Sequence, residues 1–361
     1  MSSDGPLIHI HLAHQALQEL PSPDVYFSQG YGRAASIPVE GEWLLLEAFD
    51  GAWQVPLIVR TIVNGAKDAI SPYGYSGVYA SPSLSSSQIQ DAWSATINCL
   101  RDLGVISTLL RHSPLVPQAS DLPGLISIVS KHPTIVLEPA DSDSAWSQMV
   151  STCRTRIRKA LKNGYTGDVR QASNQDFAPS GDFRRLYEQT MSRLGANPMY
   201  FFGDSYFSEL LRGLGSNLLI AEVRNQTGVP VSSALLMRHA HLVHYHLSGS
   251  RVDDARMGTN NLMLWIATQF TVEQGLRRFH LGGGLGPRDG LFHFKSTFGG
   301  RELEYDVSGL IIDHERYQAL TRDRAKKCEI TTDTLLDYHS FPAYRGGVPG
   351  LKRHQPPLSQ L

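Results

Sequence analysis

A chain of 361 residues exceeds the usual size of one compact core, and its length favours about two domains. Its 33 basic and 34 acidic residues give a formal charge of −1, which excludes the overall basic character of many nucleic-acid and membrane-surface binders. Any basic site must therefore be local. Cys99, Cys153 and Cys328 are widely spaced and odd in number, which argues against a disulfide framework or a zinc cluster and fits a reducing compartment.

Hydropathy gives no sign of export or membrane insertion. The first residues have no basic segment before an apolar run, and nowhere do about 18 apolar residues follow one another. We therefore expect a cytoplasmic protein. The last residues, 346–361, are rich in Pro, Gly and polar side chains, and this composition predicts poor order.

The first half of the chain reads as a hairpin followed by a helix and a strand. Residues 42–63 form two apolar runs joined at Asp50-Gly51, a dipeptide that suits a tight hairpin turn. Residues 87–104 keep helical spacing of apolar side chains and stop at Gly104, and 105–110 are typical of a buried strand.

A basic segment, residues 145–164, separates the two halves and predicts one amphipathic helix. Two interpretations of its cations stay open. They can form a solvated face that favours the helix C-terminus, or they can bind phosphate through the forked guanidinium groups. The apolar stripe is Trp146, Val150, Cys153, Ile157 and Leu161, and the cations are Arg154, Arg156, Arg158, Lys159 and Lys162. Two further helices, 182–195 and 205–215, carry apolar residues at core spacing.

The second half repeats the order of the first. Residues 217–223, 229–239 and 242–249 are consecutive apolar runs with short links, as in an antiparallel meander. A helix over 259–275, beginning at a Thr/Asn cap, and a strand over 277–283 follow. Because this order occurs twice, the sequence predicts two similar α/β lobes.

Several familiar chemistries lack their motifs. There is no G-x-S-x-G elbow, no Walker phosphate loop and no H-E-x-x-H. The run of glycines at 282–286 does not open a helix within a parallel βαβ unit, so a dinucleotide site is not expected. The histidines of HAHLVHYH, residues 239–246, have no nearby cysteine or carboxylate to complete a ligand set, and we expect no metal there.

Several segments together carry a resemblance to a known family. The run HYHLSGS at 244–250, the helix at 259–275 and above all FHLGGG…DGLFHFKSTFGG at 279–300 resemble the second lobe of the Fem-type aminoacyltransferases. These enzymes belong to the GNAT-like acyltransferase superfamily. Supporting similarities are the basic segment, residues 187–202 and SPYGYSG at 71–77.

The resemblance implies an α/β fold of two tandem GNAT-like lobes, each a mixed, mainly antiparallel sheet flanked by helices. We place the first lobe at 1–145, with 308–361 returning to it, and the second at 146–307. No long helical arm is found between 177 and 218, so the chain resembles the compact members of the family.

The implied reaction is transfer of an aminoacyl group from aminoacyl-tRNA to the amine of a peptide-like acceptor, a peptidoglycan precursor or a peptide natural product. The resemblance implies that Lys295 stabilises the oxyanion of the tetrahedral intermediate. Neighbouring phenylalanines, among them Phe294, would exclude water, and Gly283 and Gly284 would let the backbone approach a substrate. Asp289 either forms the turn before Gly290 or accepts a proton. No metal or prosthetic group is expected.

The donor and acceptor leave alternatives open. Coenzyme A-dependent GNAT enzymes hold pyrophosphate with a glycine-rich turn, and here only Gly258 of that pattern remains, which favours tRNA over acetyl-CoA or acyl-CoA. Tyr73 and Tyr75 would face an acceptor, or belong to a surface loop. Arg158 or Lys159 would bind the pyrophosphate of a nucleotide-linked muramyl peptide. DNA is not an expected partner, and a retired binding module is the non-enzyme alternative.

Overall fold

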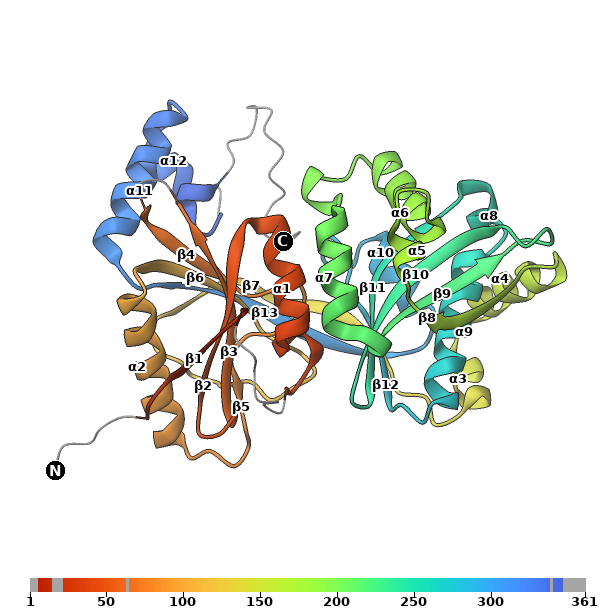
Figure 1. Cartoon of the computed structure of the whole chain (residues 1–361), viewed down its shortest axis with the longest axis horizontal. Helices are drawn as coiled ribbons and strands as arrows, with labels where there is room; N and C mark the ends of the chain where they lie inside the picture. The colour runs from red at the N-terminus through yellow and green to blue at the C-terminus, as the bar shows by residue number, and fades with distance from the viewer. Residues whose placement is uncertain (1–5, 15–21, 63–64, 338–339, 347–361) are drawn as a thin grey trace. The chain divides into compact units, whose positions relative to one another are not determined.

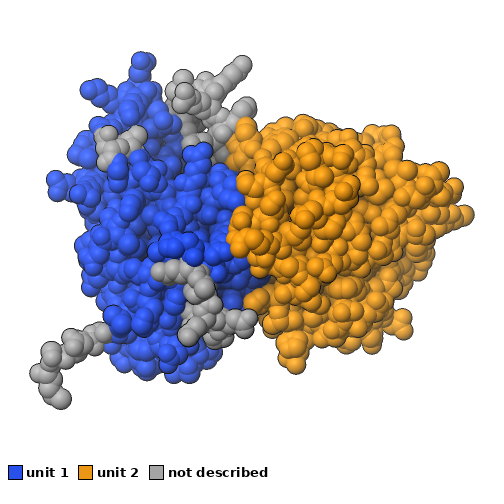
Figure 2. All heavy atoms as spheres, viewed as in Figure 1, with its two compact units in different colours: residues 1–132, 305–361 blue, residues 133–304 orange. Residues whose placement is uncertain are grey.

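A computed structural model describes residues 6–14, 22–62, 65–337 and 340–346. The chain divides into two compact units, residues 1–132 with 305–361 and residues 133–304. Figure 2 colours them blue and orange. The sequence-based boundaries were 145/146 and 307/308, so the structure places the segment before the basic helix in the second unit. The predicted disorder of the last residues falls almost entirely outside the described part of the chain.

The first unit is built on a sheet in the order β1-β2-β3-β4-β6-β13 (Figure 1). Strands β1 to β4 are antiparallel neighbours, β6 runs parallel to β4, and the second half of β13 is antiparallel to β6. The short β5 pairs with β3. The strands are β1 His9–Leu12, β2 Gly41–Ala48, β3 Trp53–Thr61, β4 Lys67–Ile70, β5 Tyr79–Ala80, β6 Val105–Arg111 and β13 Arg301–Ile311.

The predicted hairpin and helix of the first unit are confirmed. Phe49, Asp50 and Gly51 all have positive φ, as the tight turn between β2 and β3 requires. Helix α2, Ser86–Asp102, begins at a capping box in which Ser85 and Gln88 satisfy each other's backbone amides. Its buried Trp93 packs at 6.5 Å from the ring of Trp53 on β3, which joins the helix to the sheet.

Residues after β13 pack on the first unit. Tyr317 and Phe341 lie in one buried cluster with Ile106 of β6. Buried Asp68 on β4 accepts hydrogen bonds from both Arg60 and Arg345. The remaining helices of this unit are η1 Val25–Phe27, α1 Gln29–Ser36, η2 Ile37–Val39, α11 His314–Lys327, α12 Thr332–Asp337 and η6 Ala343–Arg345.

The second unit has the sheet order β7-β12-β11-β10-β9-β8, in which only β12 and β11 are parallel neighbours. Residues 135–137 at the end of β7 pair with β12. The strands are β7 Leu125–Leu137, β8 Thr166–Gln171, β9 Leu218–Arg224, β10 Pro230–His239, β11 Leu242–Ser250 and β12 Arg278–Gly282. The predicted antiparallel meander is therefore confirmed as β9, β10 and β11.

Helices cover both faces of this second sheet. Side chains alternate along β11, so Val243 joins the core formed with α4 and α9 whereas His246 contacts Tyr206 on α7. The helices are α3 Ser142–Gln148, α4 Ser151–Lys162, α5 Asn174–Phe177, α6 Asp182–Arg193, η4 Pro198–Tyr200, α7 Asp204–Leu214, η5 Gly215–Asn217, α8 Val252–Arg256, α9 Thr259–Glu273 and α10 Gly290–Ser296.

The two units share one order of elements, as the sequence predicted. In the first unit, three antiparallel strands are followed by α2 and by β6, which is parallel to the third strand. In the second, β9 to β11 are followed by α9 and by β12, which is parallel to β11. The predicted α/β fold with two similar lobes is confirmed at the level of topology.

The basic segment differs from its prediction. It forms two helices, because Met149 has an extended backbone between α3 and α4. Val150 and Leu161, which were assigned to the apolar stripe, are 44% and 50% exposed, and Met149 and Ala160 are buried in their place. Val150 lies in the break itself, whereas Leu161 lies one position past the helix face on which Ala160 is buried. The predicted stripe was therefore wrong at these two residues and right at its other three.

Helix α9 also begins differently from its prediction. Its cap is Gly258, with φ 96°, and not a Thr or Asn side chain. The helix is buried almost all round, because α4 lies on one side and the sheet on the other. Within the described residues, no helix combines the length and the apolar character needed to cross a bilayer.

Candidate functional site

Asp289 folds the glycine-rich loop and starts helix α10. One carboxylate oxygen accepts the amide of Phe292 at 2.9 Å, and the other accepts the amides of Leu285 at 2.7 Å and Gly286 at 3.0 Å. Burial acts to raise the pKa of Asp289, but these amide hydrogen bonds hold it below its usual value. Of its two predicted roles, the geometry is that of the turn-forming residue.

Lys295 is a buried amine on α10. Its side chain is 5% exposed, and Nζ donates a hydrogen bond of 2.6 Å to the carbonyl of Gly283. Burial lowers the pKa of Lys295 to about 7, and the nearby carboxylate of Asp289 opposes that shift. The amine therefore changes charge near neutral pH, which an exposed lysine does not do.

The glycines before α10 meet different structural requirements. Gly282 has φ 70°, a backbone conformation that favours glycine, and its neighbour Gly283 turns its carbonyl to Lys295. A Cβ on Gly284 would lie 1.9 Å from a carboxylate oxygen of Asp289. The loop can close on Asp289 only because no side chain occupies that space.

Sequence reasoning missed one aromatic ring that lies close to the lysine amine. Nζ of Lys295 lies 5.4 Å from the ring centroid of Tyr245 on β11, and the Tyr245 hydroxyl is hydrogen-bonded to Ser248. Phe292 and Phe298 are buried in the core of the unit, and Phe294 packs edge-on against Phe298. Tyr245 stood inside the HYHLSGS run, which was a signal for the family but not for this contact.

Three histidines of β11 and β12 have close polar partners. Nδ1 of His280 on β12 is 3.3 Å from Nδ1 of His244 on β11, and Nε2 of His246 is 2.7 Å from the hydroxyl of Tyr206. Burial, followed by the charge of His244, lowers the pKa of His246 to about 3. No group of three or more potential metal ligands occurs among the described residues.

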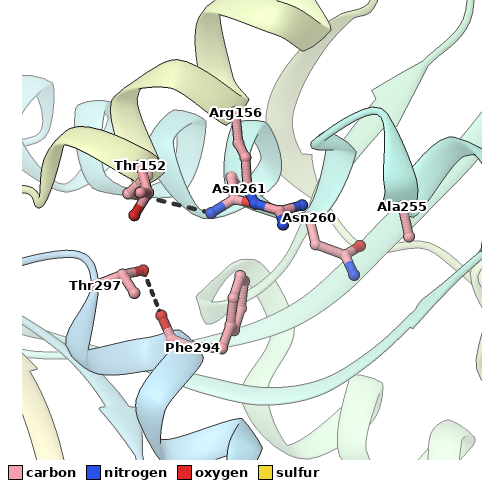
Figure 3. A pocket seen from close by; sticks show the side chains of 8 residues that line it. Thr152, Arg156, Ala255, Asn260, Asn261, Phe294 and Thr297 are labelled. Carbon is pink, nitrogen blue, oxygen red and sulfur yellow. Dashed lines mark hydrogen bonds between the residues drawn. The ribbon is translucent and has the colours of Figure 1, made fainter.

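A pocket of about 310 Å³ opens between α4, the start of α9 and the end of α10. In Figure 3, Arg156, Asn260 and Asn261 approach one another on one side, with Phe294 and Thr297 facing them. The amide of Asn261 donates to the buried thiol of Cys153 at 3.4 Å. Sequence reasoning counted Arg156 among the cations of the basic helix but did not assign it to a site, because the pocket joins three separate segments.

Helix α4 covers the turn at Gly258. A Cβ at Gly258 would lie 2.4 Å from the carbonyl oxygen of Arg156, so the turn and the helix are in direct backbone contact. The hydroxyl of Ser232 bonds Thr259 at 2.6 Å and Asn260 at 3.1 Å. The start of α9 is thus held by α4 on one side and by β10 on the other.

The two cations assigned to phosphate binding have intramolecular contacts. The guanidinium of Arg158 lies over the ring of Trp146 at 5.1 Å, and Lys159 donates to the carbonyl of Arg256 at 3.2 Å. Arg154 donates to carbonyls at the end of α3, including that of Ser147 at 3.1 Å. Arg158 and Lys159 remain exposed, so a role in binding an anion stays a prediction.

Tyr73 and Tyr75 lie in the first unit. The carbonyl of Tyr73 accepts the hydroxyl of Tyr31, and Arg111 lies over the Tyr73 ring at 5.8 Å. The ring of Tyr75 packs 5.0 Å from that of Tyr305. Because Lys295 belongs to the other unit, the expectation that these tyrosines face the same cleft stays a prediction.

Comparison with known proteins bears on the fold. Residues 148–296 match the family model of the acetyltransferase (GNAT) domain. The structure of FemX is similar, with 14% identity, a TM-score of 0.63, and coverage of 83% of this chain and 95% of that one. No curated protein matches.

Two further solved structures are similar. One is lysylphosphatidylglycerol synthase (L-PGS) from Bacillus licheniformis, with 12% identity, a TM-score of 0.53, and coverage of 81% of this chain and 93% of that one. The other is the C-terminal domain of a putative lysylphosphatidylglycerol synthetase from Agrobacterium fabrum, with 13% identity, a TM-score of 0.51, and coverage of 76% and 87%. At such identities the likeness establishes a common fold. The chain therefore has the GNAT-like fold that its sequence predicted, in a form similar to FemX over most of its length.

Proposed function

We propose that the protein is an acyltransferase that moves an aminoacyl group from aminoacyl-tRNA to the amine of a peptide-like acceptor, forming a peptide bond. The observation that carries the proposal is the buried amine of Lys295, held at the end of β12 by the carbonyl of Gly283. The GNAT domain match supports an acyltransferase, and the similarity to FemX and to lysylphosphatidylglycerol synthase favours an aminoacyl group as the cargo.

The chemistry of ester aminolysis gives Lys295 its role. The acceptor amine attacks the ester carbonyl, the carbonyl oxygen becomes an oxyanion, and collapse of this intermediate breaks the bond to the ribose oxygen of the tRNA. The acceptor nitrogen loses a proton and the ribose oxygen gains one. A lysine ammonium that is shielded from water stabilises the oxyanion more strongly than an exposed one, because the local dielectric is lower.

The start of α9 supports tRNA as the donor. Coenzyme A-dependent enzymes hold pyrophosphate with a glycine-rich turn at this place, and here only Gly258 of that pattern is present. The adjoining pocket offers Arg156 and Asn260, which suit the ribose and phosphate groups of an RNA 3′ end. Phe294, Gly283 and Gly284 would contact the aminoacyl group between this pocket and Lys295.

The acceptor is proposed by chemical class. A peptide amine is required for peptide-bond formation, and a peptidoglycan precursor or a peptide natural product would supply it. Tyr73 and Tyr75 would bind its peptide or sugar groups by hydrogen bonds. If the acceptor carries a nucleotide pyrophosphate, the exposed Arg158 and Lys159 are the cations proposed to bind it.

The test is transfer of a radiolabelled amino acid from a charged tRNA pool to candidate amines, with ribonuclease added to a parallel reaction. We expect label in a peptide product, and we expect ribonuclease to abolish its formation. Transfer that survives complete digestion of the tRNA would overturn the tRNA-dependent function. Acceptors would be offered as free peptides and as nucleotide-linked muramyl peptides, so that the preferred class is read from the same experiment.

The GNAT domain match favours a second candidate, coenzyme A-dependent N-acyl transfer. Calorimetric titration with acetyl-coenzyme A, together with a thiol-release assay on the same amines, distinguishes the two. Heat of binding and thiol release without any effect of ribonuclease would establish the second candidate in place of the first.

A further inference from the structure

The two parallel strands of the second unit separate at one residue pair. Strands β11 and β12 pair through Leu242 with Arg278, Val243 with Phe279 and His244 with His280, which is the last pair. Directly after His280, the register of β12 with β7 shifts by one residue, and Gly282 has φ 70°. A bulge of this kind changes the direction of a strand. His280 is therefore the last regularly paired residue before β12 turns away.

The lysine amine lies where the strands have separated. Its hydrogen-bond acceptor, the carbonyl of Gly283, lies three residues beyond His280 and directly after the end of β12. The ring that it faces, that of Tyr245, directly follows His244 on β11. These two contacts of Nζ are therefore made by residues that follow the last strand pair, so the positions of His244 and His280 determine them.

The histidine pair is a buried hydrogen bond. Both side chains are buried, the rings are perpendicular at 84°, and their Nδ1 atoms are 3.3 Å apart. A hydrogen bond between two Nδ1 atoms requires a proton on one and a lone pair on the other, so the two rings must have complementary tautomers. A proton on both Nδ1 atoms would break this bond, because neither atom would then have a lone pair to accept it.

The surroundings keep His280 uncharged. Burial, followed by the positive charges of His244 and Lys295, lowers its pKa well below the usual value. Asp289 is the acidic group near the lysine, and on the far side His246 is hydrogen-bonded to Tyr206. A His280 ring that stays neutral can keep its hydrogen bond to His244 while Lys295 titrates.

We propose that His280 is a positioning residue for Lys295. Its hydrogen bond to His244 fixes the point at which β12 leaves β11, and thereby sets the carbonyl of Gly283 against the lysine amine. The claim that His280 positions Lys295 rests on the structure alone, whereas the claim that this affects turnover rests on the proposed function. The histidine itself does not touch the reacting atoms.

The test compares two substitutions of one residue. His280→Leu removes the hydrogen bond and keeps an apolar side chain, whereas His280→Asn retains a polar group near the position of Nδ1. The titration of Lys295 is followed by NMR of ¹³Cε-labelled lysine, with its signal assigned by its loss in Lys295→Met. His132→Leu, a buried histidine of the first unit, is the matched control.

In the wild type we expect the Lys295 signal to titrate near pH 7, as burial predicts. In His280→Leu the amine loses its fixed acceptor and becomes hydrated, so its titration should move up by at least about one pH unit. Turnover should fall on the order of 10- to 100-fold, through kcat more than KM. His280→Asn should restore both, and His132→Leu should change neither.

Unchanged titration and unchanged kcat in a folded His280→Leu protein would overturn the positioning role. If that variant does not fold, ¹⁵N NMR of the wild-type histidines decides. One Nδ1–H and one Nε2–H tautomer for His244 and His280 would support the proposal, and identical tautomers would overturn it. The NMR readouts need no substrate, so a failed transfer reaction would count against the proposed function and leave this test intact.

Discussion

The two units repeat one topology, yet the parallel strand pairs that flank their central helices differ. In the first unit, β4 and β6 stay joined beyond the end of β4, because the amide of Ser71 donates to Leu109 at 2.8 Å and Ser76 bridges to His112. In the second unit, pairing of β11 with β12 stops at His244 and His280. The two repeats therefore differ at the place where the second one opens, and this is where Lys295 lies.

The N-termini of the central helices, α2 and α9, also differ between the two repeats. Helix α2 begins at the capping box of Ser85 and Gln88, which satisfies its first amides with its own side chains. Helix α9 begins at Gly258 without a side-chain cap, and its first turn lines the pocket. The N-terminus of α2 is therefore closed by its own side chains, whereas a ligand can reach the N-terminus of α9.

Apart from removal of the lysine itself, the largest expected effect comes from closing the space at Gly284. In Gly284→Ala the new Cβ would meet the carboxylate of Asp289 at 1.9 Å, and three amide hydrogen bonds hold that carboxylate in place. We expect the loop to shift and aminoacyl transfer to fall on the order of 10- to 100-fold. Gly203→Ala, where a Cβ meets open space, is the control, and equal rates for the two variants would contradict the role of the loop.

The next effect is a dependence of the transfer rate on pH, which arises from Lys295 beside the separated strands β11 and β12. Because the pKa of Lys295 is lowered to about 7, its ammonium predominates below that pH and falls toward a tenfold loss per pH unit above it. The rate, corrected for the fraction of unprotonated acceptor amine, should decline likewise above pH 7. Lys295→Arg keeps its charge, so the alkaline decline should vanish in that variant. Persistence of the decline would assign it to another group.

A smaller effect is expected where α4 meets the start of α9. Gly258 has φ 96°, and a Cβ there would lie 2.4 Å from the carbonyl of Arg156. Gly258→Ala should lower the free energy of unfolding by about 1–3 kcal/mol, which thermal or denaturant unfolding would measure. A variant as stable as the wild type would show that this contact is relaxed in solution.

The smallest effect is expected at the corresponding start of α2. Ser85→Ala removes one half of the capping box and should cost about 1 kcal/mol of stability. Transfer activity should stay at the wild-type rate, because this helix start lines no described pocket. A loss of activity without a loss of stability would mean that the first repeat also contributes to the site.

The sequence was sufficient to predict the helices and strands in which apolar residues recur at a regular spacing or a turn signal is clear. The Asp50-Gly51 hairpin, the helix over 87–104 and the meander from β9 to β11 were all predicted. Strand β4 was not, because its four residues include Lys67 and Asp68 and lack an apolar run. The break at Met149 was missed as well, since helical spacing on both sides concealed it.

The site was only partly predictable. Lys295 came from the family resemblance, and Asp289 from the turn chemistry that its structure now displays. Tyr245 and the His244–His280 pair were missed because their contacts depend on the parallel register of β11 and β12, which are separated by α8 and α9 along the chain. Arg156 was one of several similar cations, and only the packing of α4 on α9 distinguishes it.

The central claim is tested most directly by single-turnover transfer from charged tRNA, comparing Lys295→Met with wild type. Met preserves the buried unbranched side chain and removes the cation. We predict that the rate falls on the order of 10²- to 10³-fold while affinity for charged tRNA is unchanged. Lys327→Met, an exposed lysine of α11, should retain the full rate. A folded Lys295→Met protein that transfers at the wild-type rate would contradict the account.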